Sequence, residues 1–479
     1  MHKRRPDPLR TLLIALIAVT VSLGLRAQDA PTPPIHLVIL HANDTHGDLD
    51  PVPVKGQLVA GMARMATIVN QVRAENPGGI LLLHAGDILS RGDALTVHSG
   101  GDLNFRIMGA MGFDALTPGN GDFYFGLDNL RRLGRLARFP LLHANTTLAG
   151  TDTAPFVPMM TTTVQGVRVA IIGVGCLNKD HPTTRLLGYR EPEDCVREWA
   201  ARLRPQCDLL IALTHIGVSP DKHLAAKVPA LDLIVGGHSH TQLDKPIRVS
   251  RPRDGGSVVI VQAAAGGLYL GRVDVYLQPS DTTRLTVDRI EGRLISLDET
   301  VPEDPVVVAM LEPERAVLAA TVATLDEPLP NAGAGRGTMG AFAAEAVREQ
   351  TGADVALLDR GAVCAGLPAG KVTLTDICKV HPWRNHVLLL TCTGAQLADW
   401  IAVLDPLVAG CEYRRVILGI KGLRIGDDPA VADRVYRVAV GDYLRATTPL
   451  LRDVPADDTG VRVDSALEAH LRGLTKLKP

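Results

Sequence analysis

Carboxylate, amide and imidazole side chains follow several short apolar segments of this sequence, close to the point where each segment ends. They are Asp44, His46, Asp87, Asn120, His215, His238 and His240. Asp44 and His46, for example, come shortly after the apolar run 38–40, and a carboxylate with an imidazole two positions away is a common metal-binding pair. Because each polar side chain follows an apolar segment at a similar position, we expect them to share one binding site. Carboxylate, amide and imidazole ligands favour a divalent cation at such a site.

The apolar segments must position these side chains, and their lengths indicate buried strands. We expect strands at residues 35–40, 80–83, 111–116, 167–174, 209–213 and 231–235. Helical spacing of apolar residues, as at 61–70, alternates with these strands and favours an α/β layered sheet. Such sheets bind ligands beyond the carboxyl ends of their strands, so we expect the polar side chains to share one rim.

A chain of 479 residues is too long for one hydrophobic core, which favours two domains. Residues 258–277 are expected to form two strands, and the charged, proline-containing segment 297–315 is expected to connect the domains. In the second domain we expect helices at 339–350, 397–404 and 465–473, and strands at 355–358 and 436–440. The predicted boundaries are 1–27 for a signal peptide, 35–290 for the first domain, 291–316 for the linker and 317–479 for the second domain.

The N-terminus predicts export. Basic residues at positions 3–5 precede the apolar stretch 11–25, which suits the ~7–15-residue apolar region of a signal peptide better than the ~20 residues of a membrane helix. We therefore expect a periplasmic or extracellular protein with no membrane span after cleavage. The formal charge of −2, without a basic run elsewhere, predicts no nucleic-acid partner, and nothing in the sequence indicates a particular oligomeric state.

The seven cysteines are scattered, with no Cys-x-x-Cys spacing. This pattern argues against zinc-ribbon and dithiol redox sites. Because export permits disulfides, one or two bridges are compatible with the sequence, and the odd number leaves at least one thiol without a partner in the chain.

Taken together, the polar side chains resemble the motifs of the calcineurin-like metallophosphoesterases. These motifs are Asp44-x-His46, Gly86-Asp87, Gly119-Asn120, His215 and Gly237-His-x-His240. The second half adds Gly361-x-x-x-x-Gly-Leu-Pro-Ala-Gly370, Pro382-Trp-Arg-Asn385 and Thr393-Gly-Ala-Gln-Leu397, so from about residue 35 the chain more closely resembles the secreted two-domain 5′-nucleotidases. The resemblance implies a four-layer α/β/β/α metallophosphoesterase sandwich followed by an α+β C-terminal domain.

The resemblance also implies a site for two divalent cations, and these ligand types do not discriminate among manganese, zinc, iron, magnesium and calcium. Asp87 would bridge the two cations. Asp44, His46 and His240 would complete one site, and Asn120, His215 and His238 the other. Two such cations acidify water and clamp the oxygens of a displacement at phosphorus. The implied partner is a small anionic substrate, a phosphate ester, in nucleotide catabolism.

One catalytic motif departs from the family. The family sequence Gly-Asn-His-Glu/Asp-Phe-Asp contains a His-Asp pair that helps the leaving group to depart, but here Gly121 and Tyr124 replace both members. We predict an intact metal site with altered chemistry: a weak phosphatase, one limited to good leaving groups, or one that recruits another acid. The candidates for that acid are Tyr124, Asp122 and His84, and His84 could instead support a metal ligand. The other histidines, His181 among them, are expected to be structural.

The nucleotide-binding positions of the second half also depart. The family's Asn-x-Gly-Gly-Ile-Arg stretch reads Asp359-Arg-Gly-Ala-Val-Cys364, in which Arg360 offers a charge from a different position. Arg360, Trp383 and Asn385 are the candidates for substrate binding. In the family, two aromatic rings stack on the nucleobase. Neither ring is present here, where the corresponding positions lie near Ile417 and within 442–449. Tyr443 and Trp383 are expected to be core residues and not rings that stack on a base.

Three functions therefore remain open. The first is an exported dimetal hydrolase of phosphoric esters. The second is a hydrolase of a thiosulfonate-type anion, as in sulfur-oxidation proteins that resemble this family and also lack the catalytic His. The third is a non-catalytic member that binds a ligand or partner through the same site.

Overall fold

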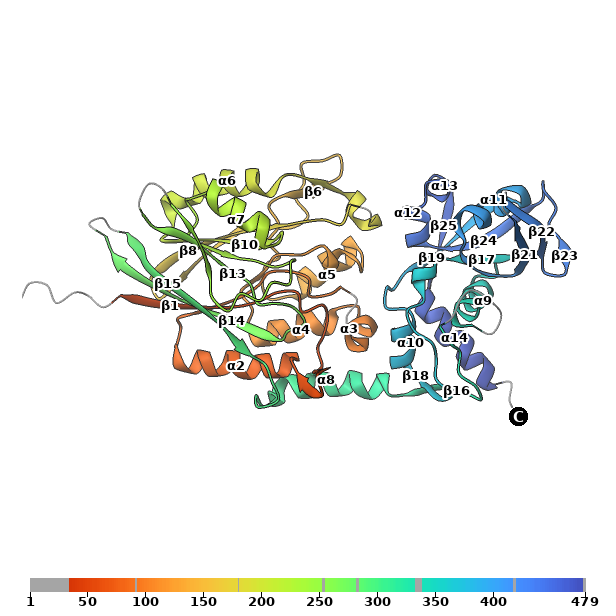
Figure 1. The fold of residues 1–479 in the computed structure, drawn as a ribbon, viewed down its shortest axis with the longest axis horizontal. Helices are drawn as coiled ribbons and strands as arrows, with labels where there is room; N and C mark the ends of the chain where they lie inside the picture. Colours follow the sequence, from red (N-terminus) through yellow and green to blue (C-terminus); the bar gives the residue numbers. More distant parts are fainter. Residues whose placement is uncertain are drawn as a thin grey trace, which may run out of the picture.

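The computed structural model describes residues 34–90, 93–179, 181–251, 255–280, 284–331, 338–416 and 419–476. They form two lobes side by side, and helix α8 (Pro305–Leu318) runs along the first lobe toward the second (Figure 1). The predicted signal peptide and Ile417 lie outside the described residues. Within the described part of the chain, no helix has the length and apolar character needed to cross a bilayer.

Two β-sheets form the centre of the N-terminal lobe. The first has the order β15-β14-β1-β4-β5 and contains β1 (Ile35–Ala42), β4 (Ile80–His84), β5 (Ala115–Leu116), β14 (Tyr269–Pro279) and β15 (Leu285–Ser296). β1, β4 and β5 are parallel, whereas β14 is antiparallel to both β1 and β15. The strand expected at 111–116 is shorter than predicted because α4 (Asp102–Met111) continues to its cap at Gly112, where φ is 71°.

The second sheet has the order β12-β13-β11-β10-β8-β7. Its strands are β7 (Met159–Val164), β8 (Val167–Gly175), β10 (Leu209–His215), β11 (Leu233–Val235), β12 (Ile247–Ser250) and β13 (Ser257–Val261). β8, β10, β11 and β13 are parallel, so their carboxyl ends share one edge. The two strands expected within 258–277 are β13 and β14, which belong to different sheets, so the chain between them crosses from one sheet to the other.

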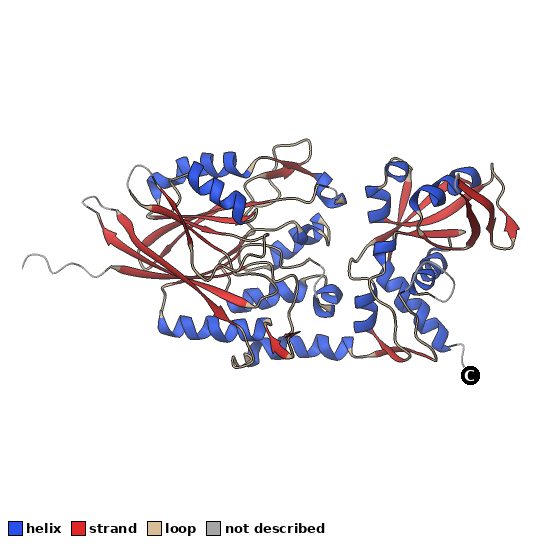
Figure 2. Cartoon of the chain, viewed as in Figure 1, coloured by secondary structure: helices blue, strands red, loops and turns tan. Residues whose placement is uncertain are grey.

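Alternating side chains divide this lobe into four layers. In β1, Leu37 and Ile39 pack between the sheets, while Val38 and Leu40 pack against the outer helices. The outer helices are α2 (Met62–Glu75), α4 and α5 (Leu127–Leu136) on the first sheet, and α6 (Pro192–Leu203) and α7 (Val218–Lys227) on the second. Figure 2 shows the strands enclosed between these two sets of helices, so the predicted α/β/β/α sandwich is confirmed.

Short elements complete the lobe. They are β2 (Val52–Val54), β3 (Gln57–Val59), α3 (Ala94–Ser99), η1 (Gly121–Phe123), β6 (Thr146–Leu148), η2 (Pro182–Leu186), β9 (Leu187–Tyr189) and η3 (Arg204–Gln206). α3 begins at Asp93, whose side chain accepts a hydrogen bond from the backbone N–H of Thr96.

The C-terminal lobe is α+β, as predicted. Its main sheet has the order β20-β17-β24-β19-β25, with β17 (Val355–Leu358), β19 (His386–Thr393), β20 (Leu407–Ala409), β24 (Val435–Gly441) and β25 (Ala456–Arg462). Two smaller sheets contain β16 (Thr321–Leu325), β18 (Gly370–Thr373), β21 (Cys411–Val416), β22 (Gly419–Ile425) and β23 (Asp428–Pro429). The helices are α9 (Met339–Thr351), η4 (Arg360–Ala362), α10 (Leu374–Val380), α11 (Gly394–Leu404), α12 (Asp442–Thr447), α13 (Pro449–Arg452) and α14 (Val463–Lys476).

The helix expected at 397–404 starts earlier than predicted. α11 begins at Gly394 because Thr393 and Gln396 form a capping box, in which each side chain accepts a hydrogen bond from the other residue's backbone N–H. The prediction relied on the spacing of apolar residues, and the first turn of this helix lacks that spacing.

The segment predicted as a linker is regular structure. Its first residues complete β15, and most of the remainder is α8. α8 starts where Asp304 accepts hydrogen bonds from the backbone N–H groups of Val306 (2.9 Å) and Val307 (3.1 Å). Leu311 and Leu318 then bury against the N-terminal lobe and continue its core toward the second lobe.

Side chains also join the lobes directly. Arg384 of the C-terminal lobe donates hydrogen bonds to the carbonyl oxygens of Val97 and His98 at the end of α3, the second at 3.0 Å. Arg185 of the N-terminal lobe donates to the carbonyl oxygen of Ala446. These contacts hold the two lobes around the rim where the parallel strands end.

Candidate metal centre and adjoining cavity

The strand ends bring the predicted metal ligands together on one rim. Asp44 Oδ1 lies 3.3 Å from His240 Nε2 and 3.9 Å from His215 Nε2, although these residues come from three different strands. Asp87 Oδ1 lies 3.4 Å from the same nitrogen of His215. The parallel strands thus gather side chains that are up to about two hundred residues apart in sequence.

The donor atoms form two adjoining groups with Asp87 between them. In one group His46 Nε2 lies 2.9 Å from His240 Nε2, which matches the separation of about 3 Å expected for two imidazoles at right angles on one cation with bonds of about 2.1 Å. The other group includes His215 and His238. Asp87 Oδ1 lies 3.4 Å from His215 Nε2, and Asp87 Oδ2 lies 4.0 Å from His46 Nδ1. Asp87 is therefore close to residues of both groups.

Buried polar atoms at this rim fit a cation. Asp44 Oδ1, His46 Nδ1 and His215 Nε2 are buried and have no hydrogen-bond partner among the described residues, a condition that costs about 1–3 kcal/mol per group. His215 Nδ1 donates to the carbonyl oxygen of Ala85 at 2.7 Å. This turns Nε2 toward the two carboxylates, where either a proton or a cation can lie between them, and a second nitrogen held by a backbone carbonyl is usual for a histidine that binds metal.

The loops that carry these ligands have strained backbones. Asp44, His46, Asp87, His238 and His240 have φ values between 49° and 77°. A left-handed conformation costs a residue other than glycine about 1–2 kcal/mol, and such strain concentrates at functional sites. The backbone N–H of Asp44 donates to the carbonyl oxygen of Gly86 (2.8 Å), and that of His46 to the carbonyl oxygen of Asp87 (2.9 Å), which fixes the two loops against each other.

Asp87 and His215 behave as a charged pair. Burial alone would raise the pKa of Asp87, but the facing His215 outweighs burial and lowers it to about 2. In the same way, burial would lower the pKa of His215, and the Asp87 carboxylate raises it to about 9. A bound cation would take the place of the proton on His215.

Glycine at position 119 lets the loops approach. A Cβ there would lie 2.3 Å from Asp87 Oδ1 and 2.5 Å from His215 Nε2. We expect Gly119→Ala to displace one of these groups, to weaken manganese binding by about 10–100-fold and to destabilise the fold by about 1–3 kcal/mol, as measured by calorimetric titration and thermal unfolding. Gly473→Ala is the matched control because a Cβ there meets nothing within 4 Å. Manganese affinity equal to that of the wild type in Gly119→Ala would contradict the geometry.

Asp122, a predicted candidate for the catalytic acid, is fully buried beneath the site. Its oxygens accept hydrogen bonds of 2.8–2.9 Å from the backbone N–H groups of Asp87, Ile88, Leu89 and Gly119. Both oxygens are therefore engaged in shaping the loop that presents Asp87. Asp122 therefore organises the loop, which argues against its predicted role as the acid.

His84 is also fully buried, and burial lowers its pKa to about 3. Its Nδ1 accepts a hydrogen bond from the backbone N–H of Gly86, and its Nε2 lies 3.2 Å from Thr45 Oγ1. An imidazole enclosed in this way has no access to a substrate, which argues against the predicted role as an acid. The supporting role fits instead, because His84 links the loop of Asp44 and His46 to the loop of Asp87.

Tyr124 is the candidate acid that remains at the surface of the site. Its hydroxyl oxygen accepts hydrogen bonds from Asn120 Nδ2 (3.3 Å) and Asn178 Nδ2 (3.2 Å). The first bond turns Asn120 Oδ1 toward the donor atoms of the rim. Tyr124 also lines an adjoining cavity, so one side chain links the predicted metal ligands to the space between the lobes.

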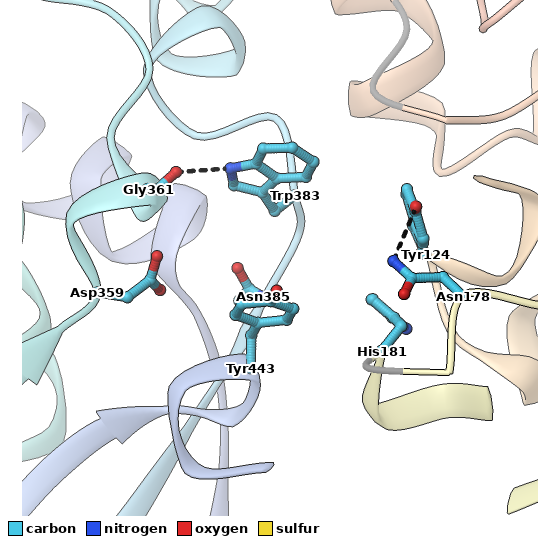
Figure 3. Close-up of a pocket in the computed structure, with 8 residues that line it drawn as sticks. All are labelled: Tyr124, Asn178, His181, Asp359, Gly361, Trp383, Asn385 and Tyr443. Atoms are coloured by element: carbon cyan, nitrogen blue, oxygen red, sulfur yellow. Dashed lines mark hydrogen bonds between the residues drawn. The ribbon is translucent and has the colours of Figure 1, made fainter. Parts of the chain in front are cut away.

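This cavity, of about 310 Å³, is formed by both lobes (Figure 3). Its lining is Tyr124, Asn178 and His181 from the N-terminal lobe, and Asp359, Gly361, Trp383, Asn385 and Tyr443 from the C-terminal lobe. Trp383 Nε1 donates to the carbonyl oxygen of Gly361 at 2.9 Å, which fixes the indole against η4 (Figure 3). The ring of His181 lies between those of Tyr124 and Tyr443, with centroids 4.7 and 5.8 Å away.

The cavity changes several predictions for the second lobe. Trp383 and Asn385 line it, as expected of substrate contacts, whereas Arg360 is drawn away by a 3.0 Å ion pair with Asp405. Tyr443 and Trp383 are not core residues, because both face this space. His181, expected to be structural, belongs to the cavity wall, and burial lowers its pKa to about 4.

Cys176 is a residue at the rim that the sequence-based prediction missed. It follows β8, and its backbone N–H donates to the carbonyl oxygen of His215 at 2.9 Å. Its thiol joins His215 and His238 in a compact group of donor atoms. Within the described residues, which include all seven cysteines, no disulfide forms. The missed signal was a polarisable side chain directly after a buried strand.

Asp221 is a fully buried carboxyl group behind β10, and it predicts a pH-dependent stability. Thr214 Oγ1 donates to its Oδ1 at 2.7 Å, and burial raises its pKa to about 7. Because this lies above the unfolded value of about 3.9, its contribution to stability is complete below that value and is lost as the pH rises through about 7. We expect Asp221→Asn to stabilise the fold by about 2–3 kcal/mol more at pH 8 than at pH 5 in urea unfolding.

The exposed Asp152→Asn serves as the control for this measurement. An equal effect of Asp221→Asn at both pH values would show that the carboxyl group does not titrate within the fold.

Known proteins show the same organisation. The calcineurin-like phosphoesterase model matches residues 37–242, and the 5′-nucleotidase C-terminal domain model matches residues 318–448. A 5′-nucleotidase of Vibrio vulnificus is 26% identical, over 85% of this chain and 84% of its own. The trifunctional nucleotide phosphoesterase protein YfkN of Bacillus subtilis is 28% identical over 86% of this chain, which spans only 32% of that relative's length.

A solved structure agrees with these matches at the level of the fold. The 5′-nucleotidase precursor from Thermus thermophilus superimposes with a TM-score of 0.60 and 24% identity, covering 92% of this chain and 97% of that chain. The residues matched by the two family models correspond to the N-terminal and the C-terminal lobe, respectively. The chain belongs to the family in which a calcineurin-like phosphoesterase domain is followed by a 5′-nucleotidase C-terminal domain.

Proposed function

We propose that this protein is an exported, metal-dependent hydrolase of phosphoric monoesters, similar to the 5′-nucleotidases. The observation that carries the proposal is the convergence on one rim of the buried, unpartnered atoms Asp44 Oδ1 and His215 Nε2, with Asp87 Oδ1 3.4 Å from the same nitrogen. Buried polar atoms without hydrogen-bond partners destabilise the fold. A cluster of them therefore indicates a binding site and not a role in packing. Export rests on the N-terminal sequence, with its basic residues before the apolar stretch 11–25.

The side chains of the rim would hold two divalent cations. Asp44, His46 and His240 would bind one, Asn120, His215 and His238 the other, and Asp87 would contact both. The cations would supply acidity to water and would draw charge from the phosphoryl oxygens. The two carboxylates also fix the loops that carry the other ligands. Asp44 Oδ2 accepts a hydrogen bond of 2.8 Å from the backbone N–H of His238, and Asp87 Oδ1 accepts one of 2.7 Å from that of Gly121.

Hydrolysis adds the oxygen of water to phosphorus and breaks the bond from phosphorus to the ester oxygen. The departing alcohol then needs a proton. Tyr124 is placed to donate it, because its hydroxyl oxygen already accepts from Asn120 and Asn178 and its own O–H can point into the cavity. The attacking water gives up a proton, which restores the Tyr124 hydroxyl, so the products are inorganic phosphate and an alcohol.

The interlobe cavity would hold the alcohol portion of the substrate. Trp383 and Tyr443 offer ring faces, while Asn385 and Asp359 offer polar atoms. Aromatic faces with a few polar groups suit a flat, polar leaving group such as a nucleoside. The lining of the cavity therefore supports a nucleotide-like substrate.

A substrate panel tests the proposal. Metal-depleted full-length protein, restored with manganese, should hydrolyse p-nitrophenyl phosphate and nucleoside 5′-monophosphates, and a chelator should remove the activity. Thiosulfate in the same panel tests the thiosulfonate-type alternative. Absence of chelator-sensitive hydrolysis of every phosphate ester would overturn the proposed function and favour a binding role. Export is tested separately, by the N-terminal sequence of the mature protein.

A further inference from the structure

Cys176 occupies an unusual place for a thiol. β8 and β10 are parallel neighbours with Gly175 opposite His215, so the next residue of β8 emerges beside the ligand-bearing end of β10. Gly175 allows this approach, because a Cβ there would lie 2.6 Å from the carbonyl oxygen of Pro118 and 2.8 Å from His143 Nε2. The fold therefore delivers a thiol to the rim through a close backbone contact.

The distances around this thiol match those of a cation's ligand set. Cys176 Sγ lies 3.5 Å from His238 Nδ1 and 3.6 Å from Asn120 Oδ1. For a zinc–sulfur bond of about 2.3 Å and a zinc–nitrogen bond of about 2.1 Å, ligand angles of about 90–109° separate the two donor atoms by about 3.1–3.6 Å. His215 Nε2, fully buried and without a hydrogen-bond partner among the described residues, faces the same space.

We propose that Cys176 is a further ligand of the cation held by Asn120, His215 and His238, and that it makes this half of the centre selective for zinc. The inference rests on the proposed metal-dependent function and assigns a ligand beyond it. Cys176 would bind as the thiolate and release its proton to water.

The two halves of the centre then differ in chemical character. Asp44, His46 and His240 present oxygen and nitrogen, which suit manganese, iron or magnesium. The half that contains Cys176 adds sulfur, which selects zinc among the common divalent cations. The resulting centre would take up two different metals, with Asp87 shared between them.

Cys176 also lines a cavity of about 510 Å³ together with Glu191, Glu193 and Asp194. Glu193 and Asp194 form ion pairs with Arg197, so their charge is largely compensated. This cavity contains none of the residues of the interlobe cavity, so the thiol side of the rim is reached from a different side than the proposed substrate space.

Cobalt spectroscopy tests the proposal without relying on activity. Co²⁺ is titrated into metal-depleted full-length protein while the near-ultraviolet band of thiolate-to-cobalt charge transfer is recorded. We expect the band in the wild type and its loss in Cys176→Ser. Zinc affinity should fall by about 10–100-fold or more in that variant, by analogy with the loss of other groups that support a metal, whereas manganese affinity should change much less.

Cys364→Ser is the matched control, because Cys364 is exposed and lies in the other lobe; it should retain the band. Protection of Cys176 from alkylation by zinc, followed by mass spectrometry, provides a second measurement should Cys176→Ser fold poorly. Cobalt binding without the band, or Cys176→Ser with an unchanged band and zinc affinity, would overturn the role of Cys176 while leaving the metal centre intact. Failure of the wild type to bind any cation would overturn both.

Discussion

Asp87→Asn is expected to reduce phosphate-ester hydrolysis by about 10³-fold or more and to remove at least one cation from the protein. Asp87 is the carboxylate that faces both ligand groups, with Oδ1 3.4 Å from His215 Nε2 and Oδ2 4.0 Å from His46 Nδ1. An amide keeps the size of the side chain but loses its charge and one acceptor. The loss of several kcal/mol of transition-state stabilisation corresponds to the expected change in rate. Steady-state kinetics and elemental analysis measure the two effects.

Thermal unfolding must accompany these measurements, because Asp87 also pairs with His215 and its replacement changes the stability of the metal-free protein. Asp128→Asn is the control, since the Asp128 side chain on α5 is 99% exposed. If Asp87→Asn retains both cations and activity within about tenfold of the wild type, Asp87 does not bridge the centre.

Tyr124→Phe is expected to make the enzyme dependent on good leaving groups. If the Tyr124 hydroxyl protonates the departing oxygen, its loss should lower kcat for nucleoside monophosphates and alkyl phosphates by about 10²–10⁴-fold, but should change hydrolysis of p-nitrophenyl phosphate much less. Nitrophenolate departs without a proton, so only poor leaving groups need the acid. The measurement is kcat for a series of aryl and alkyl phosphates in the two proteins.

The same series separates proton donation from positioning. Tyr124 also orients Asn120, and a purely positioning role would lower kcat for every substrate alike and weaken manganese binding. Tyr276→Phe is the matched control, because Tyr276 lies opposite His36 at the amino end of β1, far along the strand from the rim. A uniform loss in Tyr124→Phe would exclude Tyr124 as the acid.

Local patterns predicted the strands and the rim at their ends, whereas the four-layer sandwich and the α+β second domain were implied by the resemblance to a known family. Long apolar runs such as 80–83 form buried strands whatever their neighbours are, and parallel strands place their following residues at one edge. Asp87 could therefore be located from Gly86 and the run before it. The left-handed φ of 55° at Asp87 could not, because nothing in the residue type requires it.

The candidates for the acid show where this reasoning stops. Asp122 and Tyr124 are two positions apart in one turn, yet one side chain is fully buried and the other lines a cavity. The direction of Asp122 depends on the backbone N–H groups of the Asp87 loop, more than thirty residues away. That of Tyr124 depends on the amides of Asn120 and Asn178. Such long-range hydrogen bonds cannot be inferred from the residue types alone.

Long-range packing likewise decided the roles of the aromatic residues and of Cys176. Trp383 and Tyr443 line a cavity rather than a core because the N-terminal lobe supplies the opposite wall through Tyr124 and His181. Cys176 gains its neighbours from the register of β8 with β10. In both cases the informative contact joins segments that the sequence presents far apart.

The most direct test of this account is the number of cations bound by the purified full-length protein. After metal depletion and reconstitution with zinc and manganese, elemental analysis should find two cations per chain, and anomalous diffraction should place them on either side of Asp87. Binding of no cation, or of one cation away from this carboxylate, would contradict the account.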